Sequence, residues 1–221
     1  MPASPSSKSS NRSTRRRPHL RYEEQARRAG FSHIVGVDEV GRGCLFGPVV
    51  AAAVILKPGV SIRGLADSKD LDRKTREAIA PRIRERCEAW AIAAIDAVRI
   101  DRINIYQAAR VAMERAVAKL PITPDYILAD AMTLNLPQAQ QSLIHGDSRS
   151  RSIAAASILA KVERDAWMRQ WDRIYPQYGL AANKGYGTPT HLEALRLHGP
   201  TPLHRLSFAP VSISQQGAGA V

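Results

Sequence analysis

The chain has 221 residues, of which 44% are hydrophobic, and its net charge is +12. This length allows one full domain with a real core but is short for two. No apolar run reaches the roughly 18 residues that cross a bilayer, and Cys44 and Cys87 lie too far apart for a metal or redox motif. A chain this basic favours polyanionic partners, nucleic acid first and anionic membranes second.

Residues 1–30 form a basic leader rich in serine and arginine, which we expect to be disordered. Its first 28 residues carry eight arginines and lysines against two glutamates. The leader is interpreted either as a solvated tail or as a flexible arm that raises nonspecific affinity for nucleic acid, with a transit peptide as a weaker third alternative. It lacks the apolar segment of a secretory signal, so we expect a cytoplasmic protein. Residues 31–210 then form the domain, and 211–221 a flexible tail.

Hydrophobic patterning predicts strands and helices in alternation after the leader. In chain order we expect strands over 33–40 and 47–56, a helix over 71–89 with a kink or boundary at Pro81, a strand over 90–98, a helix over 104–120, strands over 126–130 and 141–147, a long helix over 152–174, and a shorter helix that is capped by Thr188 and ends at Gly199. This order predicts one mixed α/β sheet with a helical C-terminal third.

Four carboxylates end or interrupt the predicted strands: Asp38, Glu39, Asp130 and Asp147. Ligands gather near the ends of neighbouring strands in such sheets, so we expect these acids to lie close together. Clustered carboxylates repel one another unless hard cations bind between them, and ligation by oxygen alone suits Mg²⁺ or Mn²⁺ rather than zinc. In a basic protein, this pattern favours metal-dependent cleavage of phosphodiesters, with two ions per site.

Other interpretations of the same acids stay open at this point. Asp38 and Glu39 are neighbours and face opposite sides of a regular strand, so both reach one metal only if the chain bends or bulges there. Such a pair at a strand end is more often solvated than catalytic, and Asp147 is also a candidate helix cap.

Seven segments in order resemble ribonuclease HII, the bacterial type 2 ribonuclease H. They are "GVDEVGRG" with "GPVVAAAVIL", "LADSK", "INIYQAARVAMERAV", "YILAD", "HGDSRSRSIAAASILAKVERD", "YPQYGLAANKGYGTPTHLEAL" and "HRLSF". The resemblance covers about residues 33–210. It implies an RNase H-like fold, with a five-stranded mixed sheet flanked by helices and a helical C-terminal portion.

The resemblance also implies an activity. Members of this family hydrolyse the RNA strand of RNA–DNA hybrids and cut 5′ to ribonucleotides embedded in duplex DNA, using Mg²⁺ or Mn²⁺ and leaving 3′-hydroxyl and 5′-phosphate ends. We therefore expect RNA–DNA hybrids and ribonucleotide-containing duplexes as partners, no membrane, and a monomer. The sequence leaves open the metal used in the cell and any protein partner.

Site residues carry over by position. Asp38, Glu39, Asp130 and Asp147 match the family's metal ligands. The loop Gly41-Arg42-Gly43 matches the one that contacts the ribose 2′-hydroxyl, the group that distinguishes RNA from DNA. Tyr186 matches the tyrosine that stacks at the RNA–DNA junction, although a half-buried structural tyrosine is the alternative. Lys69 and Lys184 are candidate phosphate contacts, or solvated lysines.

The chain departs from the family pattern at Cys44, Phe46, Asp70 and Ala131, which puts rate and junction preference in doubt more than reaction type. Two functions of other kinds remain as alternatives. One is a DNA nuclease with the same fold, of the transposase or resolvase kind, and the other is a basic nucleic-acid-binding protein without catalysis.

Overall fold

The computed structural model describes residues 18–66 and 68–217. Their centre is a five-stranded sheet in the order β3-β2-β1-β4-β5. The strands are β1 (Ile34–Val40), β2 (Val49–Leu56), β3 (Cys87–Ile95), β4 (Tyr126–Asp130) and β5 (Ala139–Leu143). β1, β2 and β3 pair antiparallel, whereas β4 pairs parallel to both β1 and β5. The predicted mixed sheet is confirmed.

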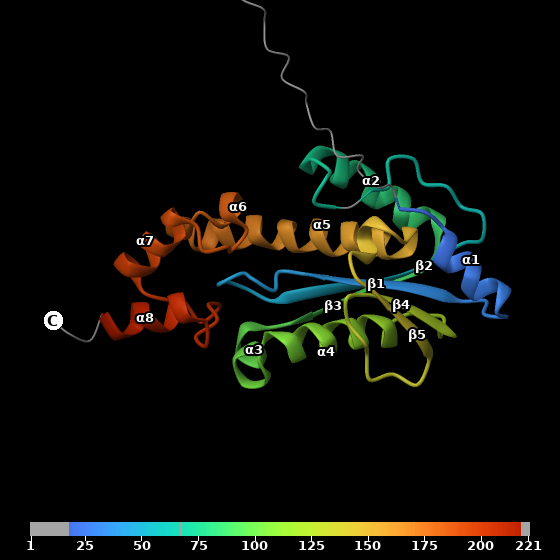
Figure 1. The fold of residues 1–221 in the computed structure, drawn as a ribbon. Helices are drawn as coiled ribbons and strands as arrows, with labels where there is room; N and C mark the ends of the chain where they lie inside the picture. Colours follow the sequence, from blue (N-terminus) through green and yellow to red (C-terminus); the bar gives the residue numbers. More distant parts are fainter. Residues whose placement is uncertain (1–17, 67, 218–221) are drawn as a thin grey trace, which may run out of the picture.

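The sheet is covered by helices on both faces (Figure 1). The helical segments are α1 (Arg21–Arg28), α2 (Arg73–Arg86), α3 (Ala97–Ile103), α4 (Ile105–Ala118), η1 (Gly146–Ser148, 3₁₀), α5 (Arg151–Ile174), η2 (Pro176–Tyr178, 3₁₀), α6 (Leu180–Asn183), α7 (Pro189–His198) and α8 (Ala209–Gly217). Helices α5 and α2 cover one face, and α3 and α4 the other. Each interface contains a cluster of buried Ala, Val, Ile and Leu.

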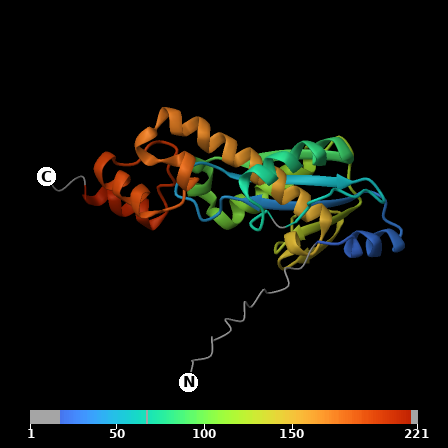
Figure 2. The same cartoon turned by 90° about the horizontal axis from the view of Figure 1, so that it is seen from above.

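The C-terminal elements extend the molecule beyond one end of the sheet (Figure 2). There, α6, α7 and α8 gather around the last turns of α5. A separate apolar cluster that includes Phe46, Met168, Tyr178 and Leu195 holds them together. Because Phe46 belongs to the β1–β2 connection, this cluster joins the N-terminal hairpin to the C-terminal portion. No helix among residues 18–66 and 68–217 has the length and apolar character needed to cross a membrane.

Helix α5 approaches the middle of β1 closely at Gly36. A Cβ atom at this position would collide with the backbone of Ser152 and Ile153, so only glycine allows the helix to lie this near the strand. The contact fixes the position of α5 relative to the two acids that follow on β1.

Several element boundaries differ from those that the sequence predicts. Helix α2 passes through Pro81, because the residues before it supply the first turns and only one backbone hydrogen bond is lost. The predicted strand over 90–98 begins earlier, at Cys87, and is followed by α3, which was not predicted. β5 ends at Leu143, so Asp147 lies on the 3₁₀ turn η1 rather than on a strand.

The predictions for the two ends of the chain need correction where the structure describes them. Helix α1 lies within the predicted disordered leader, and its Glu23 is buried against the start of α5. Glu23 Oε1 accepts hydrogen bonds from Ser150 Oγ and from the Ser152 backbone and hydroxyl, at 2.6–2.9 Å. A carboxylate is stabilised at a helix N-terminus, and this contact explains why α1 is held against the start of α5. Helix α8 likewise occupies much of the predicted flexible tail, because Val211 is fully buried. Residues 1–17 lie outside the described part.

Candidate active site

Asp38 and Asp130 lie at the same edge of the sheet. β1 and β4 run parallel with Val37 opposite Ala129, so the next residue on each strand is an aspartate. Both side chains line a cavity of about 530 Å³. The pairing of β1 with β4 ends at Val37, and the register of β1 with β2 continues unbroken through Asp38 and Glu39. Glu39 therefore reaches the same cavity at an open strand edge, and the bend or bulge that the sequence seemed to require is absent from β1.

Asp38 is the most enclosed of the carboxylates that line this cavity, with 4% of its surface exposed. Its Oδ1 atom accepts a hydrogen bond from its neighbour's backbone, Glu39 N, at 2.8 Å. Burial raises the pKa of Asp38 well above its usual value, and the charges of Glu39 and Asp130 raise it further, against a hydrogen bond from Ser157 that lowers it. The folded protein thus holds a carboxylate where its negative charge is poorly stabilised.

Glu39 has one compensated and one uncompensated oxygen. Its Oε1 lies 3.3 Å from Arg42 Nη1, whereas its buried Oε2 has no hydrogen-bond partner. Burial raises the pKa of Glu39, and Arg42 opposes this shift. Buried polar atoms are nearly always paired, so an orphaned carboxylate oxygen facing other carboxylates indicates a place for a cation.

Asp130 and Asp147 are held by the turn that follows β5. Asp130 Oδ1 accepts from Gly146 N at 2.7 Å, and Asp147 accepts from Ser148 N at 2.9 Å and from Lys69 Nζ at 3.0 Å. Burial raises the pKa of Asp130, the Gly146 bond lowers it, and the charge of Asp147 raises it. η1 therefore links the third and fourth predicted ligands.

The oxygen donors fit a hard divalent cation. Asp38 is buried among like charges, and Glu39 has a free oxygen. As they stand, each carboxylate is bonded to its own donor, and within residues 18–66 and 68–217 no three histidine, cysteine or carboxylate side chains are already grouped around one ion position. The assignment of these four acids as metal ligands stays a prediction.

Two buried arginines, Arg164 and Arg205, support the loop Gly41-Arg42-Gly43 on its buried side. Arg164 donates to the carbonyls of Phe46, Pro48 and Lys184, and Arg205 donates to those of Arg42 and Gly47. Gly41 has φ +93° and its missing side chain leaves room for the Arg164 guanidinium. The loop is thereby joined to the segment that carries Tyr186.

Tyr186 lies beside Gly43 at the other side of the cavity. A Cβ atom on Gly43 would stand 3.8 Å from the tyrosine ring, and 43% of the Tyr186 surface is exposed. Backbone pairing of Cys44 with Tyr186 and a hydrogen bond from Leu45 N to Gly185 O (2.7 Å) connect the two segments. The structure thus brings the glycine–arginine loop and this tyrosine together, next to the acids.

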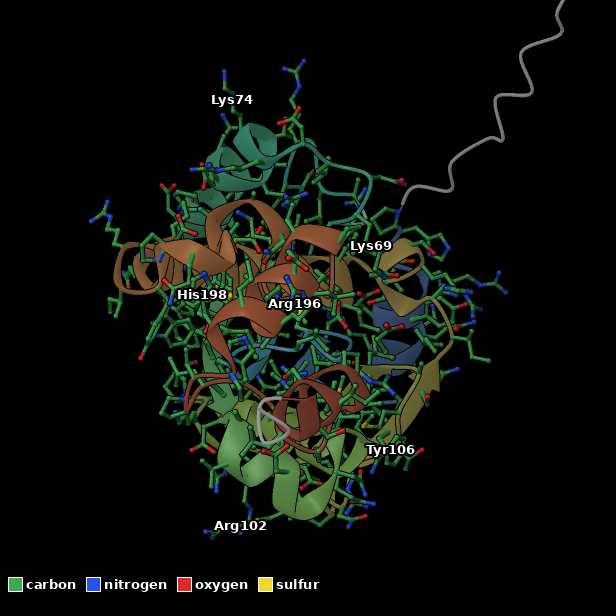
Figure 3. The ribbon with its side chains drawn as sticks, turned by 90° about the vertical axis from the view of Figure 1, so that its left-hand side faces the viewer. Lys69, Lys74, Arg102, Tyr106, Arg196 and His198 are labelled. Atoms are coloured by element: carbon green, nitrogen blue, oxygen red, sulfur yellow. The ribbon has the colours of Figure 1, made fainter. Side chains whose placement is uncertain are left out.

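The two predicted phosphate-binding lysines lie differently. Lys69, labelled in Figure 3, is 77% exposed at its side chain. It lines the cavity and pairs with Asp147. Lys184 follows α6, its Nζ donates to the carbonyl of Ala181 in that helix, and Lys184 is not among the residues lining the cavity. Burial lowers the pKa of Lys184. The structure therefore supports Lys69 better than Lys184.

Sequence reasoning missed four polar residues that line the cavity: Ser68, Arg76, Ser157 and Lys161. Ser157 and Lys161 share one face of α5 with Asp165, which is buried and pairs with Lys161 (2.9 Å) and Arg76 (3.9 Å). The sequence signal for the residues on α5 is their four-residue spacing, which places them on one face of a helix.

Comparison with known proteins places the chain in a family. A sequence model of the family described as ribonuclease HII matches residues 35–211. Ribonuclease HII from Koribacter versatilis (strain Ellin345) is 59% identical over 191 residues, which cover 86% of this chain and 75% of that protein. Ribonuclease HII from Solibacter usitatus (strain Ellin6076) is 59% identical over 189 residues, which cover 86% and 83%.

Solved structures show the same fold at lower identity. The ribonuclease H2 from Pyrococcus horikoshii OT3 matches with a TM-score of 0.75 and 22% identity, over 86% of this chain and 100% of that one. The structure of Bst-RNase HIII in complex with Mn²⁺ matches with a TM-score of 0.66 and 24% identity, over 86% and 71%. The predicted resemblance and fold class are confirmed: the chain belongs to the ribonuclease HII family and is a hydrolase of the ribonuclease H type.

Proposed function

We propose that this chain hydrolyses the RNA strand of RNA–DNA hybrids and nicks duplex DNA on the 5′ side of single embedded ribonucleotides, leaving 3′-hydroxyl and 5′-phosphate ends. The observation that carries the proposal is the shared cavity. Asp38, Glu39 and Asp130 line it together with the loop Gly41–Gly43 and Tyr186. Acids that suit metal binding and groups that suit contact with a ribose thus face the same cavity.

Asp38, Glu39, Asp130 and Asp147 would hold Mg²⁺ or Mn²⁺, with two ions per site once substrate is bound. When bound, such ions activate water for attack on phosphorus and stabilise the departing 3′-oxygen. A related protein, Bst-RNase HIII, is described in complex with Mn²⁺, which supports this class of metal. Ser157 lines the cavity beside these acids, and its hydroxyl is hydrogen-bonded to that of Ser68 at 2.8 Å.

The remaining polar residues of the cavity would bind and orient the nucleic acid. Arg42, Lys69, Arg76 and Lys161 line it and supply positive charge for the phosphate backbone. The backbone at Gly43 carries no side chain, so a ribose can approach closely and its 2′-hydroxyl can be tested. Tyr186 offers an exposed ring for stacking at the junction.

The test uses three duplexes that differ only in sugar: all-DNA, one embedded ribonucleotide, and a full RNA–DNA hybrid. With Mg²⁺ or Mn²⁺ we expect cleavage of the second and third, none of the first, and none of any with EDTA. Asp38→Asn should abolish cleavage while hybrid binding persists. Cutting of the all-DNA duplex would favour the transposase-like alternative, and binding without cutting would favour a non-catalytic protein. The oligomeric state and cytoplasmic location stay predictions.

A further inference from the structure

Two histidines form a buried pair behind Tyr186. His191 on α7 and His204 in the following loop are 0% and 1% exposed, and their Nε2 atoms stand 3.1 Å apart. His204 Nδ1 lies 2.9 Å from Thr201 N, and His191 Nδ1 lies 2.9 Å from the carbonyl oxygen of Tyr186. These three contacts form one continuous chain from Thr201 to Tyr186.

The partners at the two ends of this chain fix where each proton lies. A backbone N–H only donates, so His204 Nδ1 must accept from Thr201 and the proton of His204 is on Nε2. That proton points at His191 Nε2, which must accept it. The proton of His191 is therefore on Nδ1, from which it is donated to the Tyr186 carbonyl, an acceptor only.

Both rings are neutral in this arrangement, as burial requires. Burial lowers the pKa of His191, and burial together with the neighbouring histidine lowers the pKa of His204 to about 3. The rings of Phe46 and Tyr178 pack against His204, each with its centroid 4.9 Å away. Neither histidine lines the cavity, so neither touches substrate there.

We propose that a hydrogen-bonded relay positions Tyr186 for recognition of the RNA–DNA junction: His191 donates to the Tyr186 carbonyl, and the bond from His204 holds the proton of His191 on Nδ1, a service that a side-chain amide at position 191 would not need. Both histidines are positioning residues, and the inference rests on the proposed function. The Tyr186 carbonyl also accepts from Thr188 N at 2.8 Å, so the relay supplies its second bond. With both bonds made, the backbone beneath the exposed ring has one orientation, and the ring is held beside Gly43 before substrate arrives.

The test compares two substitutions at one position. In His191→Asn the amide nitrogen takes the place of Nδ1, so donation to Tyr186 is kept while the bond to His204 is lost. In His191→Gln the amide takes the place of Nε2, so the bond to His204 is kept while donation to Tyr186 is lost. Glutamine is closer to histidine in volume, so a packing role predicts the reverse order. His198→Gln, on the exposed side of α7 (Figure 3), is the matched control.

The measured quantity is the ratio of kcat/KM for the duplex with one ribonucleotide to that for the full hybrid. We expect His191→Gln to lower this ratio about fivefold, the effect of one hydrogen bond, and His191→Asn and His198→Gln to leave it near the wild-type value. Equal ratios for the Asn and Gln variants, with both folded by circular dichroism, would overturn the proposal.

A second measurement needs no substitution. Long-range ¹H–¹⁵N correlation spectra of the ¹⁵N-labelled protein at neutral pH distinguish the two imidazole tautomers. We expect His204 protonated at Nε2 and His191 at Nδ1. The reverse assignment, or a charged ring, would overturn the relay. If the wild-type protein nicks neither substrate, the proposed function and the selective role both fail, and these spectra decide on the relay alone.

Discussion

Replacing Asp38 with asparagine should make the metal-free protein more stable while it removes activity. Asp38 is a buried carboxylate whose pKa is raised, first by burial and then by Glu39 and Asp130. Asparagine has nearly the same shape and keeps an oxygen for the bond from Glu39 N. The substitution therefore removes an unfavourable charge without opening a cavity.

The size of the effect follows from the linkage between pKa and folding. Each unit by which folding raises the pKa of a carboxyl group costs about 1.4 kcal/mol of stability once the group is ionised. For a domain of this length, that energy corresponds to about 3–6 °C in Tm. The folded pKa exceeds the unfolded one, so the penalty is absent below the unfolded pKa and grows as pH rises through the folded value. We expect Asp38→Asn to raise Tm by at least this amount at neutral pH and to leave it unchanged near pH 4.

Differential scanning calorimetry in EDTA measures Tm at neutral pH and near pH 4 for the wild-type protein and for Asp38→Asn. Asp125→Asn is a suitable control. Asp125 accepts from Ser32 N (2.8 Å) and His33 N (2.9 Å) with separate oxygens, so an amide there loses one acceptor and should lower Tm. Added Mg²⁺ should stabilise the wild-type protein and narrow its gap to Asp38→Asn. A lower Tm for Asp38→Asn than for wild type in EDTA at neutral pH would refute the reasoning.

Three further predictions concern backbone geometry and titration. Gly41→Ala should lower the free energy of unfolding by more than about 1 kcal/mol, because its Cβ would overlap the Arg164 guanidinium at φ +93°. Gly43→Ala should keep the free energy of unfolding within about 0.5 kcal/mol of wild type in urea titrations, and should lose discrimination against the all-DNA duplex. Equal losses of stability in the two variants would contradict this. Ala131 has φ +47°, so Ala131→Gly should raise the free energy of unfolding by about 1 kcal/mol, and a loss would show that no strain is stored there. The pKa of His204 falls from about 6.5 to about 3 on folding, so the neutral ring contributes fully to stability above pH 6.5 and this contribution is lost as pH falls. The free energy of unfolding should decline by up to about 1.4 kcal/mol per pH unit below pH 6. A variant such as His204→Phe should show a smaller decline with pH.

The parts of the fold that depend on local patterning could be predicted from the sequence. β2 is a buried apolar run, and β4 matches its predicted bounds of 126–130. Helix α3 was missed because its first two residues, Ala97 and Val98, extend the apolar pattern of the preceding strand, although Asp96 caps the helix by accepting from Arg99 N at 2.7 Å. Asp147 was placed on a strand because "QSLIHGD" has no breaker before its glycine, while His145 adopts a left-handed conformation that begins the turn.

The candidate site could be predicted as a set of residues but not as an arrangement. The acids and the loop Gly41–Gly43 were found because their sequence pattern is distinctive. The supporting residues were not, because their roles depend on contacts between segments far apart in the chain. The support that Arg164 and Arg205 give to this loop becomes visible only in the fold, which buries both arginines beneath it. The pairing of Lys69 with Asp147 likewise joins residues 78 positions apart.

The course of α5 has a consequence for how a cut is placed. Ser157, beside the acids, and Arg164, beneath the loop Gly41–Gly43, both belong to α5. They are seven residues apart, which corresponds to about 10 Å along a helix. One continuous helix thus sets the distance between the acids and the loop Gly41–Gly43, the groups that we propose contact the scissile phosphate and the ribose. Errors in cleavage position should consequently arise from bending of the duplex rather than from play in the protein.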